Sequence, residues 1–433
     1  MNFLKKIIVH ILALESRLII SKYKPFIIAV TGSVGKTSTK DAIYDVLKDQ
    51  GDYVRKGEKS FNSEVGLPLT VIGVPNAWRN FRGWLRNMGA GLKLIFTRGE
   101  YPGILILELG ADHPGDIRKV VKWLKPDIAV ITKVSSTPVH VEFFKSPEEV
   151  FEEKSALAAS VKNGGTLVLF ADDDKTASMA ELLKGRDVRI LTYGIDKPAT
   201  ARGTNYAVEY ASGGPTGMSF DLDLIGEASR VRLKNVTGSQ YMYPLLAAAA
   251  VGKAKDVSLS EIVKALNSYE APKGRMNVIA GMNGSTLIDD TYNSSPDAVV
   301  VALETLKHLD CPGSKIAVLG DMMELGKYAA EEHRKIGALA ADIVTRLITV
   351  GPRSRMTAQE AVLLGMKENA IHSFDTASEA AAFLSPLVSV GDIVLIKGSQ
   401  SIRMERVTKA LMKESEKASE LLVRQEREWL LKA

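Results

Sequence analysis

The stretch FIIAVTGSVGKTSTKDAI, residues 26–43, joins an apolar run to a helical pattern through Gly-x-x-Gly-Lys-Thr. At such a joint the N–H groups of the first helical turn have no partner within the helix, and the helix dipole favours negative charge. Glycines at the joint let the backbone approach a polyphosphate closely, as nucleotide-phosphate loops do. The stretch therefore predicts a P-loop between a buried strand and a helix.

Each residue type in this loop has a use in phosphate binding. The Lys36 ammonium group can reach the β- and γ-phosphates, and the Thr37 hydroxyl is a ligand for Mg²⁺. The spacing differs from the commonest P-loop, which needs a glycine where this chain has Val30. The residues expected to contact the nucleotide phosphates are Gly32, Ser33, Val34, Gly35, Lys36, Thr37 and Ser38.

Apolar runs separated by helical patterns follow the loop. They are apolar throughout, which is typical of strands buried on both faces of a parallel sheet. Over residues 203–236 the pattern changes to period two with Gly and Pro turns, which predicts antiparallel strands at one edge. The buried runs are FIIAVTG (26–32), ILILELG (104–110), DIAVITKV (127–134) and TLVLFAD (166–172).

A second α/β pattern begins near residue 272, where APKGR interrupts the periodicity. We therefore expect an α/β fold: a P-loop domain with a parallel sheet and an antiparallel edge, followed by a second, Rossmann-like α/β domain. The strands expected in the second domain are STLIDD (285–290), KIAVLGD (315–321), RLITVG (346–351) and DIVLIKGS (392–399). The expected divisions are an N-terminal amphipathic helix (1–25), a central nucleotide-binding domain (26–271), the Rossmann-like domain (272–410) and a charged C-terminal helix (411–433).

The composition limits the class of protein. The 433 residues suffice for two or three domains, and the net charge of +5 is too small and too dispersed to indicate a nucleic-acid partner. A single cysteine, Cys311, excludes a disulfide framework and fits a reducing compartment. We expect a cytoplasmic monomer.

Two segments have a second interpretation. Residues 1–24 carry apolar side chains at helical spacing, interrupted by charges, which predicts a helix packed on the domain behind it. Residues 76–98 combine aromatic side chains such as Trp78 and Phe81 with arginines such as Arg79 and Arg82 on one helical pattern, which predicts a surface helix whose aromatic side chains cover a core. The alternative for both segments is peripheral contact with a membrane surface, or with an anionic substrate for the second.

Three further residues are expected near the P-loop. Glu108 ends the run ILILELG, His140 follows DIAVITKV after a short loop, and Lys154 lies in a helical pattern that Ser146 can cap. The carboxyl ends of parallel strands line the crevice where ligands bind. We therefore expect Glu108 and His140 at the P-loop edge, where they could hold a divalent cation beside the phosphates.

With these motifs in order, the chain resembles the Mur ligases, ATP-dependent amide-forming enzymes of cell-wall precursor synthesis. Within the family it is most similar to the branch that adds D-alanyl-D-alanine. The matching stretches are TGSVGKTST, FNSEVGLPLTVI, LELGADHPGDI, HVEFFKSPEEVFEEKSAL, APKGRM, LIDDTYNSSPDAVVVAL, VLGDMMELG and DIVLIKGSQSIRMERV, spread over residues 26–410.

The resemblance implies roles for the site residues. Thr37, Glu108, His140 and Lys154 would serve Mg²⁺, with Lys154 carbamylated so that it offers an anionic oxygen. Lys36, His140 and Lys154 would be the catalytic residues. The nucleotide contacts that the second domain would supply are Arg275, Asp290 and Asn293.

The implied reaction consumes ATP in two steps. A peptide carboxylate, such as that of a UDP-MurNAc-tripeptide, attacks the γ-phosphate to give an acyl phosphate and ADP. The amine of an amino acid or dipeptide then displaces phosphate and forms the amide. Mg²⁺ and Lys36 would stabilise the charge of the transferring phosphoryl group.

Departures from the family pattern leave alternatives open. Family members carry a UDP-sugar-binding domain ahead of the P-loop, whereas about 25 residues precede the first strand here. The adenine-side segment reads GSQYMYP (238–244) and lacks two usual amides, so the choice between ATP and GTP is open. The alternatives are a ligase acting on a poly-amino-acid or capsule polymer and a non-catalytic nucleotide-binding subunit.

Overall fold

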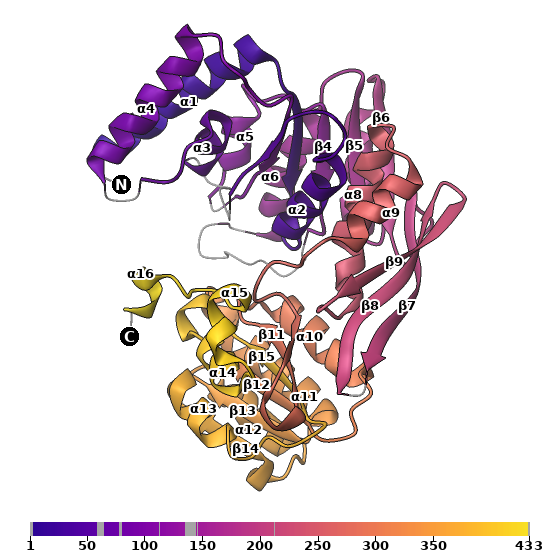
Figure 1. Cartoon of the computed structure of the whole chain (residues 1–433), viewed down its shortest axis with the longest axis vertical. Helices are drawn as coiled ribbons and strands as arrows, with labels where there is room; N and C mark the ends of the chain where they lie inside the picture. Colours follow the sequence, from indigo (N-terminus) through magenta and orange to yellow (C-terminus); the bar gives the residue numbers. More distant parts are fainter. Residues whose placement is uncertain are drawn as a thin grey trace.

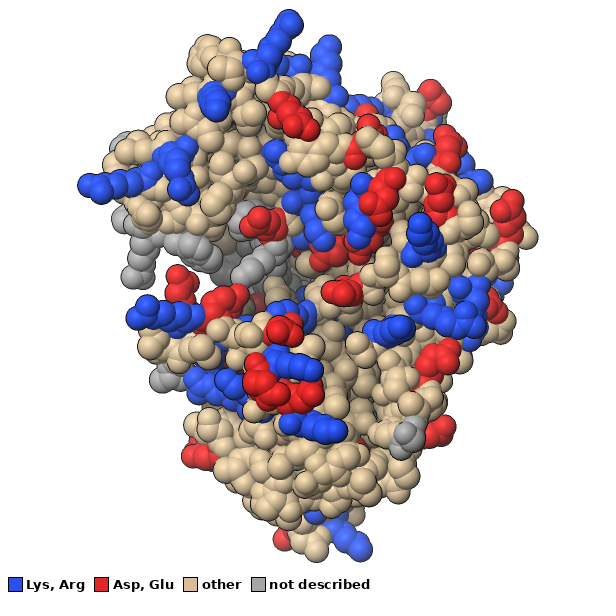
Figure 2. Space-filling model, in the orientation of Figure 1, with Lys and Arg blue, Asp and Glu red and all other residues tan. Residues whose placement is uncertain are grey.

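A computed structural model describes residues 3–58, 65–77, 80–111, 113–134, 144, 146–211 and 213–431, with side chains from Ile7 onward. The chain forms two α/β bodies, one above the other in Figure 1. The upper body is built on strands β1–β9 and the lower one on β10–β15. Basic and acidic side chains are interspersed over the face seen in Figure 2, as the small net charge predicts.

The first sheet has the strand order β2-β3-β1-β4-β5-β6-β7-β8-β9. Its strands are parallel up to the β6–β7 pair, whereas β7–β8 and β8–β9 are antiparallel, so the predicted parallel sheet with an antiparallel edge is confirmed. The bounds are β1 Phe26–Thr31, β2 Val54–Lys56, β3 Ile104–Glu108, β4 Ile128–Ile131, β5 Gly165–Phe170, β6 Val188–Gly194, β7 Ala201–Ala211, β8 Gly214–Leu224 and β9 Glu227–Lys234.

Burial on both faces explains why the central strands are apolar throughout. Along β1, Ile28 and Val30 belong to one hydrophobic cluster, and Ile27 and Ala29 belong to the cluster on the opposite face. The helices of the first domain that belong to the first cluster are α2 Lys36–Leu47, α8 Met242–Ala254 and α9 Leu259–Asn267. The opposite face is covered by α1 Phe3–Tyr23, α3 Gly66–Ile72, α4 Phe81–Phe96, α5 Asp116–Val120 and α6 Pro147–Ala159. The short helix α7 Asp174–Ala177 contacts β5.

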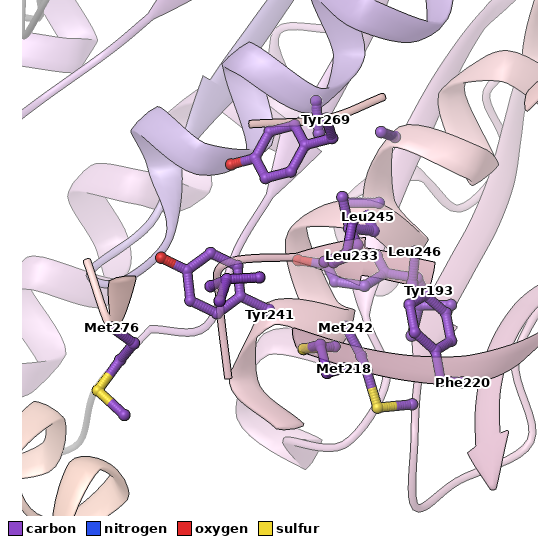
Figure 3. Close-up of a cluster of buried hydrophobic side chains, with 14 of the residues drawn as sticks. Tyr193, Met218, Phe220, Leu233, Tyr241, Met242, Leu245, Leu246, Tyr269 and Met276 are labelled. Carbon is purple, nitrogen blue, oxygen red and sulfur yellow. The ribbon is translucent and has the colours of Figure 1, made fainter. Parts of the chain in front are cut away.

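Most residues of helix α8 are buried. Its side chains Leu245 and Leu246 gather with Phe220 of β8 and Leu233 of β9 in the cluster shown in Figure 3. Small residues, Ala247–Ala250 among them, are fully buried and bring the α8 backbone close to the sheet. Gln240 and Tyr241, just before α8, line one pocket together with Val34 and Gly35 of the phosphate loop.

The second sheet has the order β10-β11-β15-β12-β13-β14, with β10 antiparallel and the others parallel. The expected second α/β domain is therefore present. Its strands are β10 Asn277–Ala280, β11 Thr286–Asp290, β12 Lys315–Gly320, β13 Arg346–Val350, β14 Ile371–Phe374 and β15 Ile393–Lys397. Its helices are α10 Pro296–His308, α11 Ala329–Ile343, α12 Arg355–Leu363, α13 Ala377–Leu384 and α14 Glu405–Leu411. The exact division at residues 271/272 stays a prediction.

The expected single charged helix over 411–433 is wrong. After α14 the described chain forms only short helices, α15 Ala418–Leu421 and α16 Arg427–Leu430. Leu422 and Arg424 between them are buried, and Arg424 has a left-handed φ of 57°. The segment bends because these side chains pack onto the second domain.

Candidate active site

The two glycines of the phosphate loop meet different requirements. Gly35 is the N-cap of α2 with φ 84°, a left-handed conformation that glycine adopts without strain. Gly32 has φ 149°, and a Cβ atom there would overlap the Thr132 side chain that follows β4. One glycine therefore serves the backbone conformation at the helix start, and the other also allows close packing of the loop against its neighbour.

The loop is tied to the end of β4. The Ser33 N–H donates to the Lys133 carbonyl oxygen at 2.8 Å. In return the Thr132 hydroxyl donates to the Val34 carbonyl oxygen at 2.7 Å. These bonds hold the loop in place before any ligand binds, which is the preorganisation that phosphate recognition needs.

Two lysines converge on one carbonyl oxygen of the loop. The Lys36 ammonium donates to Gly32 O at 2.9 Å and to Ser33 O at 3.3 Å. The Lys154 ammonium, on α6, also donates to Gly32 O at 2.8 Å, and its side chain is buried. Two cations at one oxygen repel each other, and an anion placed beside them relieves that repulsion. The pair therefore gives the loop a strongly positive site for phosphate.

A hydroxyl and a carboxylate meet beside the lysines. The Thr37 hydroxyl donates to both carboxylate oxygens of Glu108, at 3.2 and 3.0 Å, and Glu108 is only 3% exposed. The Lys40 ammonium lies 3.7 Å from the same carboxylate. Oxygen donors of this kind are the ligands that Mg²⁺ prefers, so Thr37 and Glu108 fit the metal expected from the sequence.

The remaining expected metal residue, His140, lies outside the described residues. Within the ranges that the structure describes, no group of three or more His, Cys, Asp or Glu side chains comes together. The described part of the expected metal site is therefore the Thr37–Glu108 pair with Lys154 beside it.

Glu153, which was not among the residues expected at the site, links α6 to α5. Its carboxylate accepts N–H bonds from Gly115 (3.0 Å), Ile117 (2.6 Å) and Arg118 (2.9 Å) at the start of α5. Ser146 caps α6 as predicted, accepting the Glu149 N–H. These bonds fix α6 against α5 and so position the Lys154 side chain to donate to Gly32 O.

The second domain supplies the opposite wall of the site. The Arg275 guanidinium lies over the Tyr292 ring, 4.4 Å from its centroid. The Asp290 carboxylate pairs with the Lys397 ammonium at 2.6 Å, and both side chains are buried. Lys397 also donates to the Asn293 carbonyl oxygen at 3.0 Å, which holds the loop after β11. The three residues expected from this domain thus lie on one wall.

A polar cleft joins the P-loop to that wall. Residues 32–38, Glu108 and Lys154 line it on one side, and Arg275 and Asn293 line it on the other. The sequence did not single out the other lining residues, which are Gly110, Ala111, Val150, Tyr292, Ser294, Ser295, Ala298 and Gln400. Most of them lie in loops after strands, whereas Val150 lies in α6 and Ala298 in α10, and the apolar runs of the buried strands give no sign of any of them.

A second, more apolar pocket of about 1000 Å³ adjoins the first, since Val34, Gly35, Ser38, Arg275 and Ala298 line both. Its aromatic wall consists of Phe170, Tyr193, Tyr241 and Tyr243, and Asp290 and Lys397 also line it. The Tyr241 hydroxyl donates to the Arg275 carbonyl oxygen, so this wall is also tied to the segment between the domains. A polar surface at the phosphate loop and an aromatic surface beside it thus adjoin each other.

These features define a P-loop protein whose nucleotide site lies between two α/β domains. Comparison with known proteins is consistent with this class: residues 85–252 match the Mur ligase middle domain, and residues 274–400 match the glutamate ligase domain of the Mur ligases. The UDP-N-acetylmuramoyl-tripeptide–D-alanyl-D-alanine ligases of Mycobacterium leprae and Mycobacterium tuberculosis are 30% and 32% identical to the chain. Each alignment covers 89% of this chain, and 73% and 72% of the respective relative.

Solved structures of Mur ligases have the same fold as this chain. The MurF ligase from Thermotoga maritima in complex with ADP superimposes with a TM-score of 0.76 at 27% identity, over 94% of this chain and 84% of that one. MurF from Acinetobacter baumannii gives a TM-score of 0.75 at 25% identity, over 94% and 80%. The chain belongs to the Mur ligase family.

Proposed function

We propose that the chain joins D-alanyl-D-alanine to the peptide carboxylate of a UDP-MurNAc-tripeptide and converts ATP to ADP and phosphate. The relatives that share about 30% of its sequence carry the name of this reaction. The observation that supports the proposal most is the cleft itself, where a preformed phosphate loop faces Arg275 and Asn293 of the second domain. A carboxylate needs such activation because it is a poor electrophile for an amine.

The first step forms an acyl phosphate. The acceptor carboxylate oxygen attacks the γ-phosphorus, and the bond to the β–γ bridging oxygen breaks, so ADP leaves. Lys36, held over the loop, stabilises the charge on the transferring group, and the loop backbone holds the β-phosphate. The amine then attacks the acyl carbon, phosphate leaves, and the amine loses a proton.

Thr37 and Glu108 are the described residues that would hold Mg²⁺, with His140 proposed beside them. When bound, the metal would neutralise phosphate charge and orient the γ-phosphate for attack. Lys154 touches the loop as an amine donor in this structure. We propose that its carbamylation converts this cation into an additional oxygen ligand.

The aromatic pocket is proposed to hold the nucleotide base. Tyr241, Tyr243 and Phe170 offer ring faces for stacking, and Arg275 lies where the base and phosphate pockets meet. Asp290, held by Lys397, is proposed to accept a ribose hydroxyl. We propose that the enzyme is a monomer and acts in the cytoplasm, where ATP is available.

The test is ADP release by the purified full chain with every pairing of acceptor and amine. We expect ADP and phosphate only when UDP-MurNAc-tripeptide and D-alanyl-D-alanine are both present, and no product from Lys36→Ala. Lys122→Ala, which changes an exposed lysine, is the matched control.

Two outcomes would contradict the proposal. Product formed only with a poly-amino-acid or capsule-type acceptor would assign the scaffold to a different ligase reaction. ATP turnover that is indifferent to every acceptor and amine would contradict ligase chemistry of either kind.

A further inference from the structure

Helices α1 and α4 lie side by side at the outer edge of the first domain (Figure 1). The Lys22 ammonium, near the end of α1, donates to the carbonyl oxygens of Leu94 (2.8 Å) and Ile95 (3.0 Å), near the end of α4. Gly91 of α4 has no room for a Cβ atom because the Glu15 carboxylate of α1 packs against it. The two helices therefore form one lobe, which we call the α1–α4 lobe.

The outer surface of α4 carries a continuous apolar stripe. Phe81, Leu85, Leu92 and Phe96 are 53%, 49%, 48% and 81% exposed. Their spacing of i, i+4, i+11 and i+15 places them within an arc of roughly 60° on the helix. Four large apolar side chains on one exposed stripe are not needed to cover the core, which the opposite side of α4 already does.

Helix α1 repeats this pattern. Ile7, Leu14 and Leu18 are 40%, 51% and 46% exposed, and their spacing of i, i+7 and i+11 also places them on one stripe. The core contacts of the same helix come instead from Ile8, Leu12 and Ile19. The helix is thus apolar on an outer face as well as on its packed face.

The exposed charges of the lobe have one sign. Glu15 is the only acidic residue in the two helices, and it is buried between them at 3% exposure. Basic side chains project from the lobe at the upper left of Figure 2. The exposed ionisable residues described on α1 and α4 are His10, Arg17, Lys22, Arg82, Arg86 and Lys93.

We propose that the α1–α4 lobe binds the surface of an anionic lipid bilayer, with its apolar stripes at the acyl boundary and its basic residues at the headgroups. Exposed apolar stripes flanked by Lys and Arg are the pattern of interfacial helices. In the described part of the chain, no helix is long and apolar enough to cross a membrane, so the contact is peripheral. A symmetric pairing of two lobes would place like charges against each other, which disfavours a second copy as the occupant.

The test is flotation of the full chain with vesicles of phosphatidylcholine alone or with about one third phosphatidylglycerol. We expect binding to the anionic vesicles at least tenfold tighter than to the neutral ones, and weaker binding as salt is raised. Arg82→Gln/Arg86→Gln should weaken binding to anionic vesicles by about tenfold or more, because each basic residue near such a surface contributes roughly a fivefold factor.

A second variant tests the apolar stripe. Leu92→Glu/Phe96→Glu should abolish vesicle binding while leaving the circular dichroism spectrum and nucleotide affinity unchanged, since both residues are exposed and neither lines either pocket of the cleft. Leu363→Glu/Leu364→Glu is the matched control, because these leucines of the second domain are 78% and 57% exposed.

Equal binding to both vesicle types, or full binding by Leu92→Glu/Phe96→Glu, would overturn the proposal. A dimer seen by analytical ultracentrifugation that this variant dissociates, without any vesicle binding, would assign the face to a second copy and overturn it as well. The proposal does not depend on the acceptor, so failure of the ligase assay would leave its outcome unchanged.

Discussion

Gly32 and Gly35 differ in what surrounds them, although both belong to one motif. A Cβ atom on Gly35 would meet no atom within 4 Å, so only its left-handed φ of 84° resists substitution. A Cβ atom on Gly32 would overlap the Thr132 side chain. A side chain at Gly32 must therefore displace the loop or Thr132. A side chain at Gly35 only makes the left-handed backbone conformation less favourable.

Gly32→Ala should lower the free energy of unfolding by roughly 1–3 kcal/mol and weaken ATP binding more than Gly35→Ala does. Gly89→Ala on α4 is the control, because its Cβ atom would meet open space and alanine favours a helix. Denaturant unfolding and nucleotide titration measure both effects. Equal losses from the two loop variants would show that the contact with Thr132 is unimportant.

In the proposed function, Glu108 holds Mg²⁺ through its carboxylate. Glu108→Gln keeps the size of the side chain and a bond with the Thr37 hydroxyl but removes the negative charge. We expect the Mg²⁺ concentration for half-maximal activity to rise by at least tenfold. Glu152→Gln, whose side chain is 66% exposed, should behave as the wild type. An unchanged Mg²⁺ dependence in Glu108→Gln would remove Glu108 from the metal site.

Asp289 gives a prediction about pH. Burial raises the pKa of this carboxyl group to about 7, although the hydroxyl groups of Thr291 and Thr408 donate to it. Between about pH 4 and 7 the folded state therefore keeps a proton that the unfolded state has lost, and stability falls as pH rises through this window.

Asp289→Asn should remove this dependence of the unfolding free energy on pH. The variant should therefore become more stable than the wild type by an amount that grows between pH 4 and 7 and reaches roughly 2–4 kcal/mol at pH 8. Urea unfolding at several pH values measures the difference. A constant difference across the range would show that Asp289 does not carry the buried proton.

The segment after α14 supports the side of the cleft that the second domain supplies. The Arg424 guanidinium donates to the carbonyl oxygens of Thr291 (2.5 Å) and Tyr292 (3.2 Å), in the loop that carries Asn293. Glu405 pairs with Arg403 at 2.6 Å and with Arg424 at 3.4 Å. The segment after α14 therefore holds the loop after β11 through hydrogen bonds to its backbone.

Arg424→Ala should reduce stability by roughly 2–4 kcal/mol, because it leaves buried acceptors without a partner. It should also raise the KM for ATP more than it lowers kcat. Arg427→Ala, an exposed change nearby, should do neither. If Arg424→Ala lost stability with an unchanged KM for ATP, the segment would have a purely structural role.

Elements differ in how far the sequence predicts them. The strands β1, β3, β4 and β5 were predictable because burial on both faces leaves an uninterrupted apolar run. Strand β6 was missed, since Arg189 and Ile190 within it are exposed and break that pattern. The C-terminal helix was wrongly predicted because charge and periodicity do not reveal that Leu422 and Arg424 become buried.

The whole molecule brings together residues that the sequence separates. The β7–β8 hairpin reaches the second domain, where the Thr286 hydroxyl donates to Gly213 O at 3.1 Å and the Asp310 N–H donates to the Tyr210 hydroxyl at 2.9 Å (Figure 1). These contacts, with the segment around Arg275, set the two domains facing each other across the cleft.

Site residues that belong to a local sequence motif could be predicted from the sequence. Residues that tertiary packing brings to the site could not. The phosphate loop and the position of Glu108 follow from the pattern of strand ends and helix starts, whereas the role of Lys154 came from the family resemblance. Arg275 and Asp290 came from family resemblance alone. Lys397, Glu153 and the aromatic wall depend on tertiary packing, which no local pattern encodes.

The proposed reaction requires activation of a carboxylate by phosphoryl transfer in this cleft. The most direct measurement uses an acceptor whose reacting carboxylate is labelled with ¹⁸O, and follows the label by mass spectrometry of the released phosphate. We predict one ¹⁸O atom in the phosphate for each amide formed, because the carboxylate oxygen that attacks phosphorus leaves with it. Phosphate that carries no label while amide accumulates would contradict the acyl-phosphate route.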